Sequence, residues 1–169
     1  MSFEDKIKQL IEHQVHSQPV NVLVWGPGEG ARRDYEKRRK IQYTIKSTFP
    51  NAEVRFSEEL TDAVPGAADL TAPELELYHL AACDLCVVLD SSQGPGEEIA
   101  HFGRTNFAYK LLVLTHERHK DSSSFPRSLR KHLNQVFYND DEYDSCVLVE
   151  RVLNRVRYVA LGRMAGLSA

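Results

Sequence analysis

Short apolar runs alternate with amphipathic stretches along most of the chain. The strongest runs are residues 20–25, 84–90 and 110–115, and weaker ones lie at 52–56 and 135–138. Short runs rich in Val, Leu and aromatic residues, bounded by turn residues, predict β-strands. The run 84–90 is almost continuously apolar, which is typical of a central parallel strand covered on both faces.

Apolar residues recur at helical spacing between these runs. The pattern predicts helices over 3–15, 33–48, 71–83, 95–108, 126–134 and 142–163. Thr71, Pro73 and Glu74 form a typical helix start, and Pro50 ends the preceding helix. The last helix has an apolar stripe that we expect in the core, with part of the helix at a subunit interface: Val149, Val152, Leu153, Val156 and Val159. Residues 57–71 and 116–125 are polar and predict loops.

Alternating strands and helices predict parallel strands joined by right-handed crossovers. We therefore expect one domain over residues 1–169, a three-layer, doubly wound α/β sandwich with a mainly parallel sheet of about five strands, flavodoxin-like in topology. In such folds ligands bind outside the carboxyl ends of the strands, where the strand order reverses. This rule selects the loops 26–34 and 90–98, both of which are rich in glycine.

Composition and charge narrow the range of partners and compartments. The net charge of -3 does not favour a nucleic-acid or anionic-membrane surface. No apolar run approaches the ~18 residues of a membrane span, and the N-terminus lacks a signal-peptide pattern. Three cysteines cannot all pair, and Cys83 and Cys86 are expected to be buried rather than metal-binding. We expect a cytoplasmic protein without metal, cofactor, membrane or nucleic-acid partner.

The second loop contains an anion-binding pattern with a carboxylate beside it. Asp90 closes the apolar strand, and Pro95 can occupy the first position of the next helix. Free N–H groups at a helix start, together with the hydroxyls of Ser91 and Ser92, would hold a phosphate or a ribose. Glutamates in a first helical turn are also common simply because they meet the helix dipole favourably.

Residues 80–100 resemble the nucleoside 2-deoxyribosyltransferase-like superfamily. The segment Leu-Ala-Ala-Cys-Asp-Leu-Cys-Val-Val-Leu-Asp-Ser-Ser-Gln-Gly-Pro-Gly-Glu-Glu-Ile-Ala contains an Asp that opens an apolar strand and then a Ser-x-Gly-x-Gly-x-Glu turn. That family includes nucleotide N-glycosidases and is related in fold to TIR-type NAD-cleaving domains. The similarity covers roughly residues 20–115. Cys83 and Ala100 stand where an alanine and a glycine are common.

The resemblance implies roles for individual residues. Glu98, rather than Glu97, would be the nucleophile that attacks the anomeric carbon of a ribosyl or deoxyribosyl group. The sugar or its 5′-phosphate would be held by Ser92, Gly94 and Gly96, and the ligand would be contacted at the first loop by Gly26, Pro27 and Gly28. Glu76 occupies the position of a family aspartate that orients or protonates the leaving base. Asp69 and Asp90 are further candidates for that proton donor.

Other residues near the first loop allow two interpretations each. Arg32 and Arg33 either pair with a phosphate or belong to a solvated basic helix that continues through Lys37, Arg38, Arg39 and Lys40. Tyr35 and Trp25 could stack on a base, although Trp25 at a strand end is more typical of the core. Two histidines, His116 and His119, follow the fourth strand without a wider ligand cluster.

The expected activity is therefore cleavage or transfer of an N-glycosidic bond on a nucleoside, a nucleotide or an NAD-like substrate. Such reactions pass through an oxocarbenium-like transition state, which a nearby carboxylate stabilises. Two alternatives remain open: a non-catalytic nucleotide-sensing or signalling module, and a TIR-like effector of bacterial antiviral defence that depletes NAD. Relatives often complete the site across a subunit interface, so the resemblance also implies a homo-oligomer.

Overall fold

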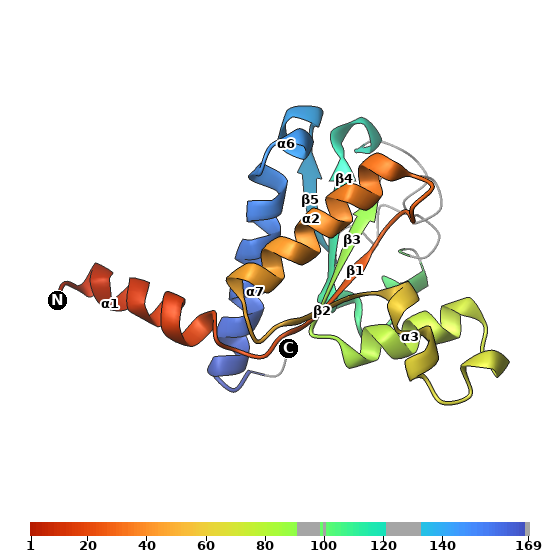
Figure 1. Ribbon diagram of the computed structural model, residues 1–169, viewed down its shortest axis with the longest axis horizontal. Coiled ribbons are helices and arrows are strands. Elements are labelled where there is room, and N and C mark those ends of the chain that lie inside the picture. Colours follow the sequence, from red (N-terminus) through yellow and green to blue (C-terminus); the bar gives the residue numbers. More distant parts are fainter. Residues whose placement is uncertain (91–98, 100, 121–132, 168–169) are drawn as a thin grey trace.

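The computed structural model describes residues 1–90, 99, 101–120 and 133–167 (Figure 1). Its sheet has the order β2-β1-β3-β4-β5, and every neighbouring pair is parallel. The strands are β1 (Asn21–Trp25), β2 (Glu53–Phe56), β3 (Leu85–Asp90), β4 (Leu111–His116) and β5 (Asn134–Tyr138). This is the flavodoxin-like order, with its reversal between β1 and β3. The predicted three-layer α/β fold is confirmed.

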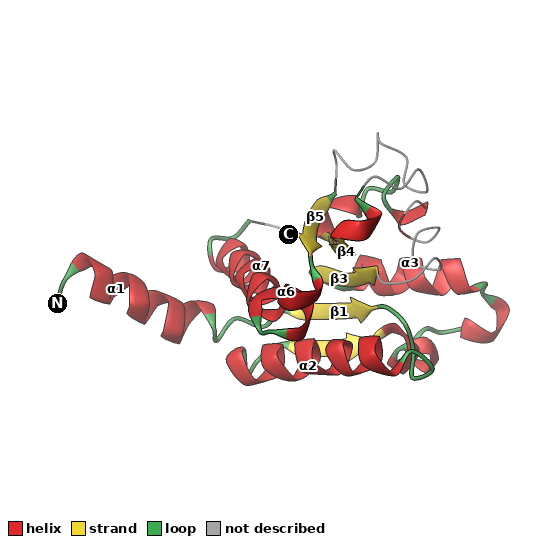
Figure 2. Cartoon of the chain, turned by 90° about the horizontal axis from the view of Figure 1, so that it is seen from above, coloured by secondary structure: helices red, strands yellow, loops and turns green. Residues whose placement is uncertain are grey.

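Helices lie on both faces of this sheet (Figures 1 and 2). The α-helices are α1 (Phe3–Gln9), α2 (Arg32–Thr48), α3 (Ala72–Ala82), α6 (Asp140–Asp144) and α7 (Val147–Met164). A π-helical segment, η1 (Leu10–Val15), continues α1. The short 3₁₀ turns are η2 (Ser57–Glu59), η3 (Thr61–Ala63), η4 (Ala67–Asp69), η5 (Ala108–Lys110) and η6 (Glu117–His119).

Successive side chains of β1 point to opposite faces of the sheet, and each face has its own hydrophobic core. Val22 and Val24 point to the face covered by α2 and α7, where Ile41, Ile45 and the stripe of α7 are buried. Leu23 and Trp25 point to the opposite face, where they pack with Leu80 of α3 and with Phe102. The predicted core position of the α7 stripe is confirmed. Trp25 is also a core residue, with its ring 5.2 Å from that of Phe102.

The predicted single helix over 142–163 is wrong, because the chain breaks at Ser145. Asn139 caps α6, whereas Ser145 has an extended backbone (φ -78°, ψ -171°) before α7 begins. Lys37 lies below this break and donates from Nζ to the carbonyl oxygens of Tyr143 and Ser145. The buried ammonium thus binds carbonyls that a continuous helix would have bonded within itself.

Two other predicted helix ends are also wrong. Residues 99, 101 and 102 are helical, but the helix does not reach residue 108, because Thr105 hydrogen-bonds the backbone of Phe102 and Phe107. Such side-chain bonds compete with helical ones. Asn134 was expected to end a helix over 126–134 and instead begins β5; the rest of that predicted helix, except Leu133, lies outside the described residues.

Candidate functional site

The turn after β1 and the end of β3 lie side by side at the reversal point of the sheet. Trp25 is paired with Val88, so the next residue, Gly26, lies against Leu89. A Cβ atom on Gly26 would meet the Leu89 Cβ at 3.0 Å and the Arg38 Cδ at 3.1 Å, and its φ of +152° is rarely adopted by other residues. Glycine is therefore required for this close approach.

Only one residue of the predicted second loop is described. Asp90 ends β3 beside this glycine turn. The predicted holding residues Ser91, Ser92, Gly94 and Gly96 and the predicted nucleophile Glu98 lie outside the described residues. In the sequence they follow directly on Asp90.

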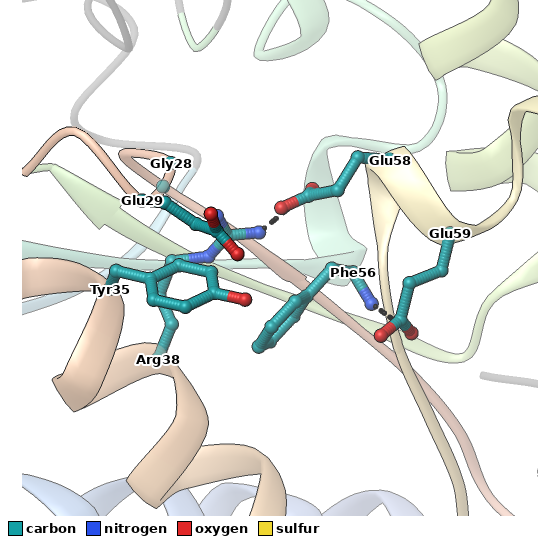
Figure 3. A pocket seen from close by; sticks show the side chains of 8 residues that line it. Gly28, Glu29, Tyr35, Arg38, Phe56, Glu58 and Glu59 are labelled. Atoms are coloured by element: carbon teal, nitrogen blue, oxygen red, sulfur yellow. Dashed lines mark hydrogen bonds and ion pairs between the residues drawn. The ribbon is translucent and has the colours of Figure 1, made fainter.

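A cavity of about 460 Å³ opens beside the glycine turn, between α2 and the end of β2 (Figure 3). It brings together three of the predicted binding residues, Gly26, Gly28 and Tyr35. Its other lining residues were not predicted: Glu29, Arg38, Phe56, Glu58 and Glu59. The rings of Tyr35 and Phe56 meet edge to face, with centroids 5.9 Å apart, and form an aromatic wall.

Arg38 is the buried centre of this cavity. Its side chain is only 1% exposed, and its Nη2 donates to the Val24 carbonyl oxygen at 2.9 Å. Nη1 donates to the carbonyl oxygen of Pro27 at 3.0 Å, and the guanidinium lies 4.3 Å above the Phe56 ring. The interpretation of residues 37–40 as a uniformly solvated basic face is therefore wrong for Lys37 and Arg38. The available signal was spacing, since Arg38, Ile41 and Ile45 share one helix face.

Glu58 balances the buried charge of Arg38 from the solvent side. Its Oε2 lies 3.0 Å from Arg38 Nη2, and Ser57 donates to the same oxygen. Burial alone would raise the pKa of Glu58, but the hydrogen bonds and charge of Arg38 outweigh it, so the pKa lies below its ordinary value. With Glu29 and Glu59, the cavity has three carboxylates and one guanidinium. This balance disfavours a phosphate inside the cavity and suits an uncharged, hydroxyl-bearing group.

Asp90 has a half-buried carboxyl group, which is held in place by a hydrogen bond from Thr115 of β4. Gln135 Nε2 donates to Thr115 Oγ1 at 3.0 Å, and Thr115 Oγ1 donates to Asp90 Oδ2 at 3.4 Å. Burial raises the pKa of Asp90, and the charge of His119 and the bond from Thr115 only partly offset this. A carboxyl with a raised pKa at a strand end is suited to general acid chemistry.

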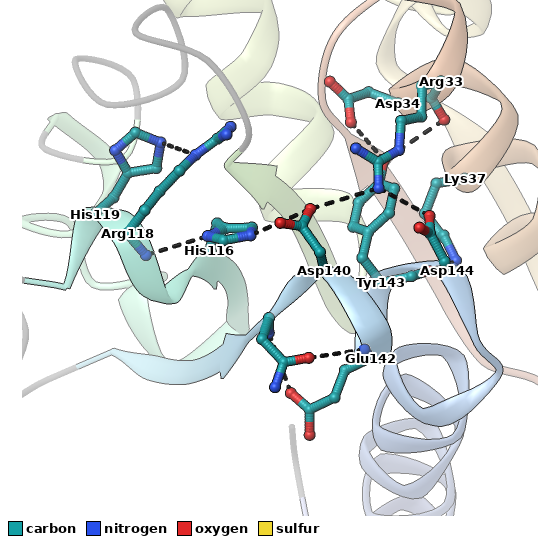
Figure 4. Close-up of polar contacts among 11 residues, drawn as sticks. Arg33, Asp34, Lys37, His116, Arg118, His119, Asp140, Glu142, Tyr143 and Asp144 are labelled. Carbon is teal, nitrogen blue, oxygen red and sulfur yellow. Dashed lines mark hydrogen bonds and ion pairs between the residues drawn. The ribbon is translucent and has the colours of Figure 1, made fainter.

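A polar network connects α2 with α6 at the β5 side of the same edge (Figure 4). Tyr143 Oη donates to Asp34 Oδ1, and Arg33 pairs with Asp144 at 2.8 Å and with Asp140 at 3.5 Å. His116 accepts at Nδ1 from the Arg118 backbone N–H (3.1 Å), and its Nε2 lies 3.5 Å from Asp140. The charge of Arg33 is thus matched by the protein's own carboxylates.

Of the remaining predicted residues, Arg32 and Glu76 are not among those that line the cavity, whereas Pro27 binds the arginine at its centre. Arg32 is exposed and pairs with Glu36 at 2.8 Å, and Pro27 contributes its carbonyl oxygen to Arg38. Glu76 is half-buried on α3, close enough to Cys86 to help burial raise the pKa of that thiol. The cysteines Cys83 and Cys86 are buried as predicted.

The described residues form neither a metal-ion site nor a membrane-crossing helix. Within residues 1–90, 99, 101–120 and 133–167, no group of three or more His, Cys, Asp or Glu side chains is placed to hold a metal ion. No helix of this part of the chain combines the length and the apolar character that crossing a membrane requires.

Comparisons with known proteins show a likeness of fold at most. Neither protein-family models nor curated proteins yield a match to this sequence. Among solved structures, the chain is similar to the crystal structure of a conserved protein from Enterococcus faecalis V583, with a TM-score of 0.43 and 12% identity. The match covers 82% of this chain and 98% of that one.

Proposed function

We propose that this protein cleaves or transfers the N-glycosidic bond of a nucleoside, a nucleotide or an NAD-like molecule, with Glu98 as the nucleophile. One observation carries the proposal. The Ser-x-Gly-x-Gly-x-Glu sequence follows directly on β3, whose carboxyl end lies at the reversal point of the sheet, and the cavity lined by Gly26, Tyr35 and Arg38 lies on the other side of the same point. Ligands of doubly wound folds bind at this position.

In the proposed reaction the Glu98 carboxylate attacks C1′ of the sugar and the C1′–N bond breaks. The electron pair of that bond leaves with the base, which takes a proton from a neighbouring carboxylic acid. Water or a second base then attacks C1′ and releases the Glu98 carboxylate. The first outcome is hydrolysis and the second is transfer.

Asp90 is the better candidate for the proton donor, and Glu76 is the second. Asp90 adjoins the turn that contains Glu98, is held by Thr115, and has a raised pKa that favours its protonated form. Glu76 interacts instead with Cys86, which lies about 13 Å before Asp90 along an extended strand. The sequence alone ranked these two carboxyls in the opposite order.

From the charges around the cavity we infer which part of the substrate binds at each of the two loops. Glu29, Glu58 and Glu59 would repel a phosphate, so we assign the phosphate to residues 91–96, the segment that the sequence predicts to be an anion-binding turn. The cavity would receive an uncharged sugar or base against Tyr35 and Phe56.

The test is to incubate the purified protein with nucleosides, nucleoside monophosphates and NAD and to measure the released base by chromatography. We expect free base from at least one of these classes. Binding by calorimetry without any product would instead favour the nucleotide-sensing module. NAD loss that begins only when the protein assembles would favour the antiviral effector.

A further inference from the structure

One hydrogen-bond donor in the wall of the cavity beside the glycine turn has no acceptor. The Arg38 side chain lines this cavity and is only 1% exposed. Its two Nη atoms bind the protein, whereas its Nε is buried and has no hydrogen-bond partner among the described residues. An unpaired buried donor costs about 1–3 kcal/mol, and a native structure that retains one calls for an explanation. The Nε–H group is therefore available to an acceptor atom of a bound molecule.

Carboxylate acceptors line the same cavity from two loops (Figure 3). Glu29, in the turn before α2, forms no hydrogen bond or ion pair with another described residue. Glu59 follows β2 and accepts the Phe56 backbone N–H at Oε2, at 3.1 Å. An ionised carboxylate has about four acceptor positions and no donor, so both glutamates can accept further hydrogen bonds. Glu58, by contrast, is already the partner of Arg38.

A hydroxyl group matches both kinds of partner in this cavity. It can accept from Arg38 Nε and donate to a carboxylate at the same time. A fully ionised phosphate only accepts and would be repelled by the glutamates, while an ammonium only donates. The described residues, which include all three glutamates of the cavity, contain no group placed to hold a metal ion. Two adjacent hydroxyls of a sugar could engage Glu29 and Glu59 together, with the apolar face of the sugar against the aromatic wall.

The place of the cavity in the sheet also fits a ribose. Glu59 follows β2, which pairs with β1, so this glutamate and the glycine turn after β1 line the same cavity. In doubly wound folds that bind dinucleotides, an acidic residue beyond the first crossover helix binds the ribose 2′-hydroxyl. The cavity volume of about 460 Å³ lies within the range of small-molecule sites, roughly 300–1,000 Å³. The cavity is thus large enough for a ribosyl group.

We propose that this cavity binds the 2′,3′-cis-diol of a ribosyl group and so selects ribosyl over 2′-deoxyribosyl substrates. One hydroxyl accepts from Arg38 Nε, and the two hydroxyls donate to Glu29 and Glu59. A 2′-deoxy sugar leaves one of these protein groups without its partner, and a site built to bond a hydroxyl rejects the analogue that lacks it. The inference rests on the proposed function, because the ribosyl group is that of its substrate.

Calorimetry of matched nucleotide pairs tests this selection. The probes are the 5′-monophosphates of adenosine, guanosine, cytidine and uridine and their 2′-deoxy counterparts, titrated into Glu98→Gln protein so that turnover does not interfere. We expect each ribonucleotide to bind at least about 10-fold tighter than its 2′-deoxy counterpart, which corresponds to one charge-assisted hydrogen bond. Adding Glu29→Gln and Glu59→Gln should reduce this preference to within about 3-fold, because an amide is a weaker acceptor than a carboxylate. The control is Glu36→Gln, which changes an exposed carboxylate of α2 outside the cavity and should retain the preference.

The diol site and the catalytic proposal fail in different experiments. Equal affinity within the nucleotide pairs would overturn the diol site, and so would a preference that survives both glutamine changes or a lack of binding up to about 1 mM. Circular dichroism checks folding, and Glu29→Gln alone serves if the double change unfolds the protein, since Glu29 supports no bond within the described residues. If the wild-type protein releases no base, the catalytic proposal fails while a measured ribose preference stands. Base release with equal affinities would keep the activity and overturn the diol site.

Discussion

The carboxylate of Glu58 lies 3.0 Å from the guanidinium of Arg38 and is the charged partner of this buried side chain. We predict that Glu58→Gln lowers the free energy of unfolding by about 1 kcal/mol at pH 7, because Arg38 keeps its two carbonyl acceptors but loses a charge-assisted bond. The native pKa of Glu58 lies below its ordinary value, so this stabilisation is present above the ordinary pKa and is lost as pH falls through the native one.

Urea unfolding of wild type and Glu58→Gln at several pH values measures this effect. The gap between them should be widest near neutral pH and should close in acid. Glu53→Gln is the control, since it breaks an ion pair with Arg55 in which both side chains are half exposed or more and should change stability little. A gap of constant size down to pH 3 would contradict the assigned role of Glu58.

Gly26 and Gly28 form a matched pair for the tight turn after β1. We predict that Gly26→Ala destabilises the protein by about 2–3 kcal/mol, because its Cβ would crowd Leu89 at an unfavourable φ. At Gly28 nothing lies within 4 Å of an added Cβ, so Gly28→Ala should stay within about 0.5 kcal/mol of wild type. Equal losses in urea unfolding would show that the close approach of Gly26 to Leu89 is not the cause.

The three cysteines should differ in reactivity. Cys146 is exposed, whereas burial raises the pKa of Cys83 to about 12 and raises that of Cys86 well above the ordinary value. Because the thiolate is the reactive form, an aromatic disulfide reagent at pH 8 should titrate one thiol in the native protein and three after unfolding. In Cys146→Ser the native signal should disappear. Rapid reaction of two native thiols would be inconsistent with the burial of both Cys83 and Cys86.

Asp90 gives the proposed activity a defined pH dependence. A proton donor must be protonated, so its raised pKa keeps Asp90 active to higher pH and the rate should fall as pH rises through that pKa. We predict that Asp90→Asn lowers kcat by about 10²–10³-fold and removes this alkaline limb. Glu76→Gln is the comparison, and it should retain the limb. The reverse outcome would transfer the proton-donor role to Glu76.

The sheet could be predicted from the sequence because its evidence is local. The apolar run at 84–90 corresponds to β3, and the glycine turns after β1 and β3 mark the ends that meet at the reversal point. The break at Ser145 could not be predicted in this way. The apolar stripe lies wholly on α7, after the break, and does not show where that helix begins. The break depends on Lys37, which is distant in sequence and binds the carbonyls there.

The candidate site was only partly predictable for a similar reason. Gly26, Gly28 and Tyr35 lie within one loop and the helix after it, so sequence proximity alone places them together. Arg38 and Glu58 meet only because β2 pairs with β1, and polar residues on a basic helix ordinarily indicate a solvated face. The apolar positions Ile41 and Ile45 on the same helix face were the signal that Arg38 points inward.

We propose that Glu98, in the segment after β3, is the nucleophile of the glycosidic reaction. The most direct measurement is the rate of base release by Glu98→Gln and by Glu97→Gln, each on the best substrate of the wild-type protein. The amide cannot act as the nucleophile, so we predict a loss of at least about 10³-fold for Glu98→Gln, whereas Glu97→Gln stays within a few-fold of wild type. Unchanged base release by a folded Glu98→Gln protein would contradict the claim.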